Sequence, residues 1–149
     1  MKVASIMTNR VATVEMDDTL RAINNLFCQA RFHHLLVVEN GILVGVISDR
    51  DLFKASSPFL DTPAERPRDV ARLSRKAHQI MTRELITVDA DTPIAEAVAI
   101  LMKNNVSCLP VVSPQGKIEG IVTWKDLLKA YMALHGEAKI ECKNCGNVF

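Results

Sequence analysis

The segment GVISDRD at residues 45–51 returns as GIVTWKD at residues 120–126. Both run glycine, two apolar residues, Ser or Thr, two variable residues and then Asp. The apolar residues favour the end of a strand, and a Ser or Thr followed three residues later by an acid is typical of a capping box at a helix start. Each segment is therefore predicted to join a strand to a helix, and its duplication indicates an internal repeat.

The duplication extends over most of the chain in a nearly constant register. The triplet IMT at residues 6–8 recurs at residues 80–82, and at the same offset LLVV at residues 35–38 matches LPVV at residues 109–112. One inserted residue then shifts the offset for the two glycine-to-aspartate segments. Chance does not keep such a register, so the sequence predicts two copies of one structural unit.

Each copy is predicted to form a strand, a helix, two strands and a second helix. In the first copy VATV at residues 11–14 is β-prone, and apolar residues then recur at helical spacing over residues 20–30. Two apolar runs follow, on either side of Asn40 and Gly41, a dipeptide suited to a tight hairpin turn. A strand–helix–strand crossover is normally parallel, so we expect an α/β (α+β) fold with a small mixed sheet in each copy.

The composition bounds both size and function. The chain has 149 residues, of which 48% are apolar and 23% charged, with a net charge of +1, and this suits one compact domain rather than a large enzyme. Such a charge does not by itself favour nucleic acid or an anionic membrane. The absence of a long apolar run predicts no membrane span and a cytoplasmic location. No P-loop or catalytic triad is visible, so we expect no enzyme.

Cys28 and Cys108 are expected to be small buried side chains.

The predicted organisation has four parts. Residues 1–55 form the first copy, residues 56–77 a linker, residues 78–134 the second copy and residues 135–149 a tail. Prolines and a basic stretch mark the linker, whose interpretation is a solvated surface segment, with contact to nucleic acid or phosphate as the alternative.

The two strand-to-helix turns carry the chemistry. A strand end that meets a helix start favours phosphate, because free N–H groups and the helix dipole point there. Asp51 and Asp126 are placed to accept ribose hydroxyls, and Arg50 and Lys125 each add a cation for a phosphate. Ribose and phosphate together indicate a nucleotide, although the same residues also fit plain helix caps.

The doubled pattern of IMT, LLVV or LPVV, and Ser/Thr-x-x-Asp resembles the family of cystathionine-beta-synthase-type (CBS) domains, as a stand-alone pair covering residues 3–131. The resemblance implies two clefts that hold AMP, ADP, ATP or S-adenosylmethionine. It also implies that Asp51 and Asp126 bind ribose, that Ser48 and Thr123 assist at ribose or phosphate, and that the base is lined around Thr13, Val14, Thr87 and Val88.

The residues just before the middle strand differ between the copies. They are His33 and His34 in the first and Ser107 and Cys108 in the second. In the family this pair often serves the nucleotide held by the other copy's aspartate. The resemblance therefore predicts that phosphate-bearing ligands prefer the Asp126 cleft, with Thr123, Lys125, His33 and His34, over the Asp51 cleft. The alternative for the two histidines is a solvated connection between helix and strand.

The function expected from this resemblance is a regulatory module that senses an adenine nucleotide. It would act as a homodimeric disc on an unidentified partner protein. The tail adds CxxCG at residues 142–146, which resembles half of a zinc ribbon. Zinc held by Cys142 and Cys145 and shared across a dimer is the preferred interpretation, zinc held by this pair with His135 and a further ligand is a second, and no bound metal is the third. A nucleic-acid-associated regulator that uses this tail is the alternative function.

Overall fold

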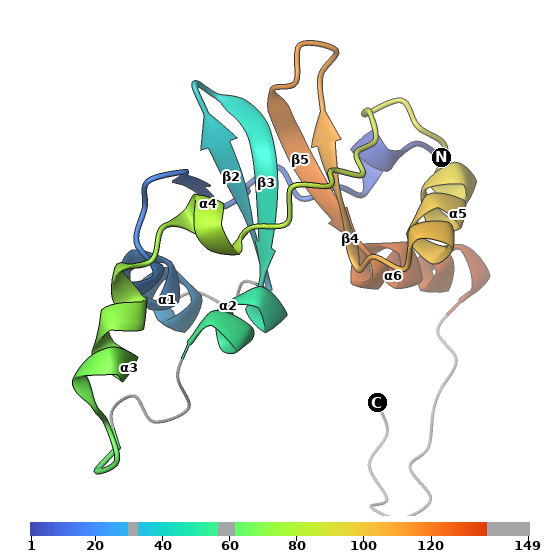
Figure 1. Cartoon of the computed structure of the whole chain (residues 1–149). Helices are drawn as coiled ribbons and strands as arrows, with labels where there is room; N and C mark the ends of the chain where they lie inside the picture. Colours follow the sequence, from blue (N-terminus) through green and yellow to red (C-terminus); the bar gives the residue numbers. More distant parts are fainter. Residues whose placement is uncertain (30–32, 57–61, 137–149) are drawn as a thin grey trace, which may run out of the picture.

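The computed structural model describes residues 1–29, 33–56 and 62–136 (Figure 1). The elements within these residues are, in chain order, η1 (Val3–Ser5), β1 (Thr13–Glu15), α1 (Leu20–Gln29), β2 (His34–Glu39), β3 (Ile42–Ser48), α2 (Asp49–Ala55), α3 (Pro67–Ala71), η2 (Arg72–Ser74), α4 (Ala77–Ile80), α5 (Ile94–Asn104), β4 (Cys108–Val112), β5 (Ile118–Thr123) and α6 (Trp124–His135).

The first copy has the predicted order and a mixed sheet. Its strands lie in the order β1-β2-β3, with β1 parallel to β2 and β2 antiparallel to β3. The hairpin turns at Asn40 and Gly41, whose φ angles of 52° and 77° are those that the dipeptide tolerates. The prediction for this copy is confirmed.

The second copy has a shorter sheet than predicted. Strands β4 and β5 form an antiparallel pair, and the expected first strand is reduced to one parallel bridge between Val88 and Val111. In the first copy the Leu36 N–H donates to the Ala12 carbonyl at 3.1 Å. Pro110 matches Leu36 in the repeat and has no N–H to donate, so the ladder loses a hydrogen bond there.

The IMT segment of each copy pairs with a strand of the other copy. Thr8 exchanges two backbone hydrogen bonds with Ile121 of β5, at 2.9 and 3.0 Å. Thr82 makes the equivalent pair with Val46 of β3, at 3.1 and 2.9 Å. The segment after α4 then crosses from the first copy to the second (Figure 1). The two copies are therefore one structural unit, related by pseudo-two-fold symmetry.

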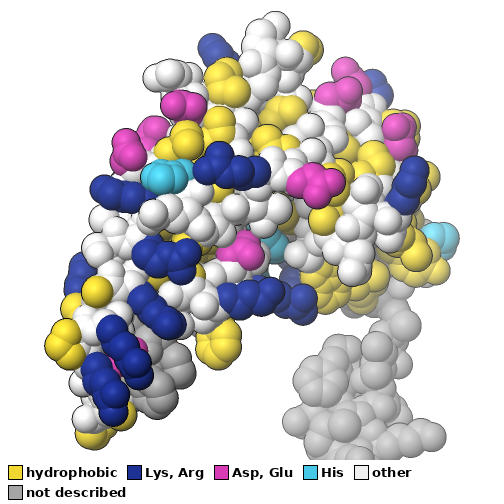
Figure 2. All heavy atoms as spheres, viewed as in Figure 1, with side chains coloured by type: hydrophobic (Ala, Val, Ile, Leu, Met, Phe, Trp, Pro, Cys, Tyr) yellow, Lys and Arg dark blue, Asp and Glu magenta, His cyan; other side chains and the backbone are white. Residues whose placement is uncertain are grey.

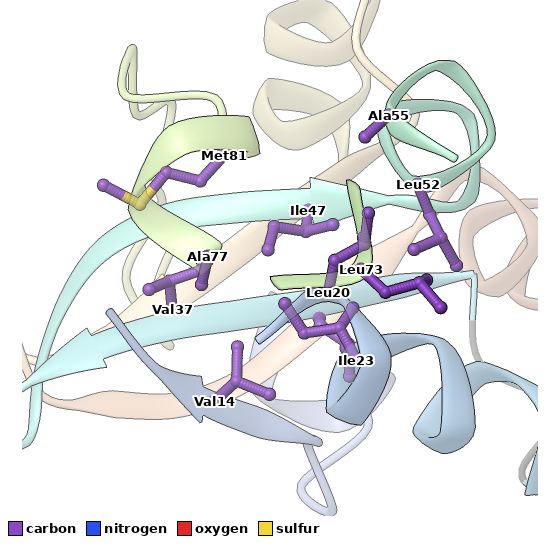
Figure 3. Close-up of a cluster of buried hydrophobic side chains, with 11 residues drawn as sticks. Val14, Leu20, Ile23, Val37, Ile47, Leu52, Ala55, Leu73, Ala77 and Met81 are labelled. Atoms are coloured by element: carbon purple, nitrogen blue, oxygen red, sulfur yellow. The ribbon is translucent and has the colours of Figure 1, made fainter. Parts of the chain in front are cut away.

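Three apolar clusters hold this unit together. Figure 3 shows the first, where Leu20 and Ile23 of α1 face Ile47 of β3. A second cluster fills the equivalent place in the other copy. The third joins side chains from both copies and so fixes their relative position; it consists of Leu36, Leu43, Cys108 and Ile121.

The segment between the copies is more ordered than a solvated linker. Leu73 and Ala77 are buried in the first cluster, and the Leu20 N–H donates to the Arg75 carbonyl at 2.7 Å. Lys and Arg side chains gather over the α3 region (Figure 2). The basic side chains are thus mostly exposed, whereas the backbone beneath them is anchored to α1. The predicted boundaries between the four parts stay predictions.

No helix among the described residues is long and apolar enough to cross a membrane.

Candidate ligand site between the two copies

A cavity of about 630 Å³ lies between the copies and is lined by both. Its volume falls in the range of small-molecule sites, which is roughly 300–1,000 Å³. The lining residues come from the two strand-to-helix turns, from the residues before β2 and β4, and from the segment after α4. They are His33, His34, Val46, Ser48, Asp49, Arg50, Asp51, Thr82, Glu84, Ile86, Asn105, Val106, Ser107, Cys108, Pro110, Thr123, Trp124 and Lys125.

Both predicted capping boxes are present. Asp51 Oδ2 accepts from the Ser48 N–H at 2.9 Å, and Ser48 Oγ accepts from the Asp51 N–H at 3.2 Å. Asp126 Oδ2 accepts from the Thr123 N–H at 2.8 Å and from its hydroxyl at 2.9 Å. In each box the cap uses Oδ2, and Oδ1 has no hydrogen-bond partner among the described residues. A cap and a ligand contact can therefore share one carboxylate.

The structure brings seven of the twelve predicted nucleotide residues to this cavity. They come from both copies, which the repeat alone did not place side by side. They are His33, His34, Ser48, Arg50, Asp51, Thr123 and Lys125.

The other five predicted residues do not line the cavity. Val14 and Val88 are buried in the first and second apolar clusters, while Thr13 and Thr87 are exposed elsewhere. Asp126 does not line the cavity either, although Thr123, to which it is hydrogen-bonded, does. The cavity is therefore lined by all four residues of the Asp51 turn and by Thr123, Trp124 and Lys125 of the equivalent turn, but not by Asp126. The predicted preference for the Asp126 cleft is not supported by this geometry and stays a prediction.

Sequence reasoning missed the last residue of the second IMT triplet and the residues that follow it as part of the site. Thr82, Glu84 and Ile86 line the cavity because Thr82 pairs with Val46, which lines it too. These three alternate along the chain, as side chains on one face of an extended segment do. The sequence of residues 82–86 shows no alternation of polar and apolar residues, so nothing in it indicated this face.

The two pre-strand pairs meet across the cavity. His34 Nε2 lies 2.9 Å from Ser107 Oγ, so side chains predicted to serve opposite clefts are hydrogen-bonded to each other. His33 Nδ1 lies 3.2 Å from Asp49 Oδ2, an ion pair whenever the ring is protonated. Burial lowers the pKa of His34 below its ordinary value, and the neighbouring Asp49 and Asp51 oppose that shift.

Cys28, Cys108 and Trp124 differ in how far they are buried. Cys108 is buried as expected, and burial raises the pKa of its thiol to about 12, so it is no nucleophile. Cys28 is exposed, contrary to expectation. Trp124 begins α6 with 49% of its surface exposed, and Lys125 Nζ lies 5.8 Å from its ring centroid.

The predicted metal site at Cys142 and Cys145 lies outside the described residues. Within residues 1–29, 33–56 and 62–136, no group of three or more His, Cys, Asp or Glu side chains could hold a metal ion.

Two pseudo-symmetric α/β repeats that exchange segments and together line one cavity define a paired-repeat ligand-binding module. The model of the CBS domain family matches residues 3–58 and 77–133. The chain belongs to the CBS domain family and is a tandem CBS pair.

Known proteins resemble the chain along most of its length. A CBS domain-containing protein of Dictyostelium discoideum is 36% identical over 128 residues, which cover 85% of this chain and 88% of that protein. The CBS domain pair of protein MJ0100, solved in complex with 5′-methylthioadenosine and S-adenosyl-L-methionine, superposes with a TM-score of 0.74 at 25% identity. That match covers 90% of this chain and 98% of the other.

A second solved structure is similar over a shared part. The cytosolic domain of the Mg²⁺ channel MgtE, solved in complex with ATP, gives a TM-score of 0.69 at 25% identity. The match covers 87% of this chain and 48% of that one.

Proposed function

We propose that this protein is a regulatory module that binds an adenosyl nucleotide, of the class AMP, ADP, ATP or S-adenosylmethionine, between its two CBS repeats. One observation carries the proposal. A single cavity is lined by Asp51, whose Oδ1 is not used by the helix cap, and by one cation from each copy, Arg50 and Lys125. The similar CBS pairs that hold 5′-methylthioadenosine with S-adenosyl-L-methionine, or ATP, support the ligand class.

The lining suggests how such a ligand sits. Asp51 Oδ1 accepts the ribose hydroxyls, since only Oδ2 is engaged in the cap. Val46, Ile86 and Pro110 supply apolar contacts for the base. The phosphate of a phosphate-bearing ligand then points toward Lys125 of the second copy.

The proposed role is binding without a chemical step. A ligand that touches both copies can stabilise one relative arrangement of them, provided that its affinity differs between two arrangements. The change in arrangement would then alter the outer surface of the pair, which a regulated protein contacts.

Titration calorimetry with AMP, ATP and S-adenosylmethionine tests the proposal, with GMP as the matched control. We expect saturable binding of at least one adenosyl ligand, with a dissociation constant in the micromolar range, about −8 kcal/mol. Trp124 is the single tryptophan of the chain and lies at the cavity, so its fluorescence gives a second readout. Absence of binding for all three adenosyl ligands would contradict the proposed function.

We also propose that the pair forms a homodimer through α6. Leu128 and Tyr131 lie on neighbouring turns of this helix with 52% and 61% of their surfaces exposed, and Met132 is 46% exposed beside them. Exposed apolar side chains grouped on one helix face mark an interaction surface. A second copy of the same chain would bury this face by symmetry.

The double variant Leu128→Glu with Tyr131→Glu is expected to be monomeric in sedimentation velocity, while the parent chain sediments as a dimer. Lys129→Glu, on the same helix but outside the apolar face, is the control. A parent chain that sediments as a monomer at about 100 μM would contradict the dimer, since weak specific interfaces reach that range.

A cytoplasmic location and zinc at Cys142 and Cys145 stay predictions from the sequence. Elemental analysis of protein purified without added metal measures the second. None of the relatives or structures above supports the nucleic-acid alternative.

A further inference from the structure

His34 lines the cavity and contacts the other copy directly. Its half-buried ring spans the two copies through the 2.9 Å contact from Nε2 to Ser107 Oγ. Ser107 is tied in turn to α6, because its carbonyl accepts from the Trp124 N–H at 3.3 Å. Charge on His34 therefore acts at the junction between the Asp51 turn and the start of α6.

The ionised side chains that line the cavity sum to one net negative charge when the histidines are neutral. Helix α2 presents Asp49, Arg50 and Asp51; the segment after α4 presents Glu84; and α6 presents Lys125. Three acids thus face two cations. His33 and Cys108 also line the cavity, and the Cys108 thiol, with its pKa near 12, stays neutral.

A ligand that carries phosphate makes this imbalance larger, whereas an uncharged or cationic adenosyl ligand does not. Near pH 7 His34 is neutral, because burial has lowered its pKa. An anion placed beside the ring favours the imidazolium and raises that pKa again. The ring can accept a proton without losing its link to Ser107, since imidazolium Nε2–H donates to a hydroxyl oxygen.

We propose that His34 determines which adenosyl ligands this cavity selects: it takes up a proton when a phosphate-bearing ligand binds and stays neutral when an uncharged nucleoside binds. This inference rests on the proposed function. Ligand choice then depends on pH. Affinity for a phosphate-bearing nucleotide rises as the pH falls, by at most about tenfold per pH unit for one proton taken up. Affinity for an uncharged nucleoside stays level.

The test compares two probes that do not change their own charge near neutrality. They are the methyl ester of AMP, a phosphodiester with one fixed negative charge, and uncharged 5′-methylthioadenosine. Calorimetry at about pH 7.5 and about pH 6, around the ordinary histidine pKa of ~6.5, gives the affinities. Repeating it in two buffers with different heats of ionisation counts the protons taken up.

For the AMP ester we expect at least about threefold tighter binding at the lower pH and net proton uptake, and neither for methylthioadenosine. His34→Gln keeps a hydrogen-bonding group for Ser107 but cannot become charged, and it should abolish both effects. His78→Gln, a histidine outside the cavity lining, should leave both unchanged. Thermal melting verifies that His34→Gln is folded, and Ser107→Ala, which keeps the imidazole, should retain proton uptake.

The outcomes separate the two proposals. If both probes bind and neither the affinity nor the proton count responds to pH or to His34→Gln, the role of His34 is wrong and the proposed function stands. Proton uptake that persists in His34→Gln and disappears in His33→Gln would also overturn it. If neither probe binds at any pH, the proposed function fails and this inference fails with it.

Discussion

Asp51→Asn is expected to weaken AMP binding by about 30-fold or more. The change removes a charge that accepts ribose hydroxyls, and a hydrogen bond to a charged group contributes about 1.5–3 kcal/mol. Asparagine keeps an oxygen for the Ser48 N–H, so the cap that holds α2 survives. Calorimetry measures the loss, and urea unfolding verifies that stability is kept.

Asp126→Asn is the matched control, because Asp126 makes the equivalent cap to Thr123 without lining the cavity. We expect it to change AMP affinity less than about threefold. The sequence predicts the opposite order, with the phosphate-bearing ligand in the Asp126 cleft. If Asp126→Asn abolishes binding and Asp51→Asn does not, the sequence prediction holds and the assignment from the cavity is wrong.

Gly120→Ala is expected to destabilise the protein by about 2–3 kcal/mol. A Cβ at Gly120 would lie 2.8 Å from the Thr8 carbonyl oxygen, a backbone atom that accepts from the Ile121 N–H, while the Thr8 N–H donates to the Ile121 carbonyl. Relief requires the IMT segment of the first copy to move off β5, so the change weakens the joint between the copies. Urea unfolding measures the free energy.

Gly45→Ala is the symmetry-matched comparison. A Cβ there would meet the side chain of Met81, which is flexible and can change rotamer. We expect a cost of about 1 kcal/mol or less. Equal losses for the two glycines, or no loss for Gly120→Ala, would show that the contact with Thr8 does not constrain the pair.

Local signals predicted much of the fold because each depends on residues near one another in the chain. Ser48 with Asp51 predicts a capping box from three-residue spacing, and Asn40 with Gly41 predicts its turn from backbone freedom alone. The structure has both. The strand expected around Val88 is reduced to a single bridge with Val111, because Pro110 beside that partner has no N–H to donate and strand pairing depends on both segments.

The candidate site was predicted less completely, since it depends on which segments meet. The histidines and the turn of the first copy were found from the repeat and the family resemblance, and both line the cavity. Glu84 was not predicted, whereas Val14, which was predicted near the base, is buried in the first core and does not line the cavity, so its role there stays a prediction. A repeat predicts equivalent positions but not which of them face one cavity.

The sequence by itself determined that two copies of one α/β unit occur and which residues end their strands and begin their helices. These features can be read from the sequence alone, because they depend on the repeat register, on the spacing of capping residues and on the alternation of apolar residues. Only the tertiary structure decided that Thr8 pairs with β5 and Thr82 with β3, that His34 meets Ser107, and that the cavity includes Asp51 rather than Asp126. These contacts join residues far apart in sequence, and packing of both copies around one shared core selects them.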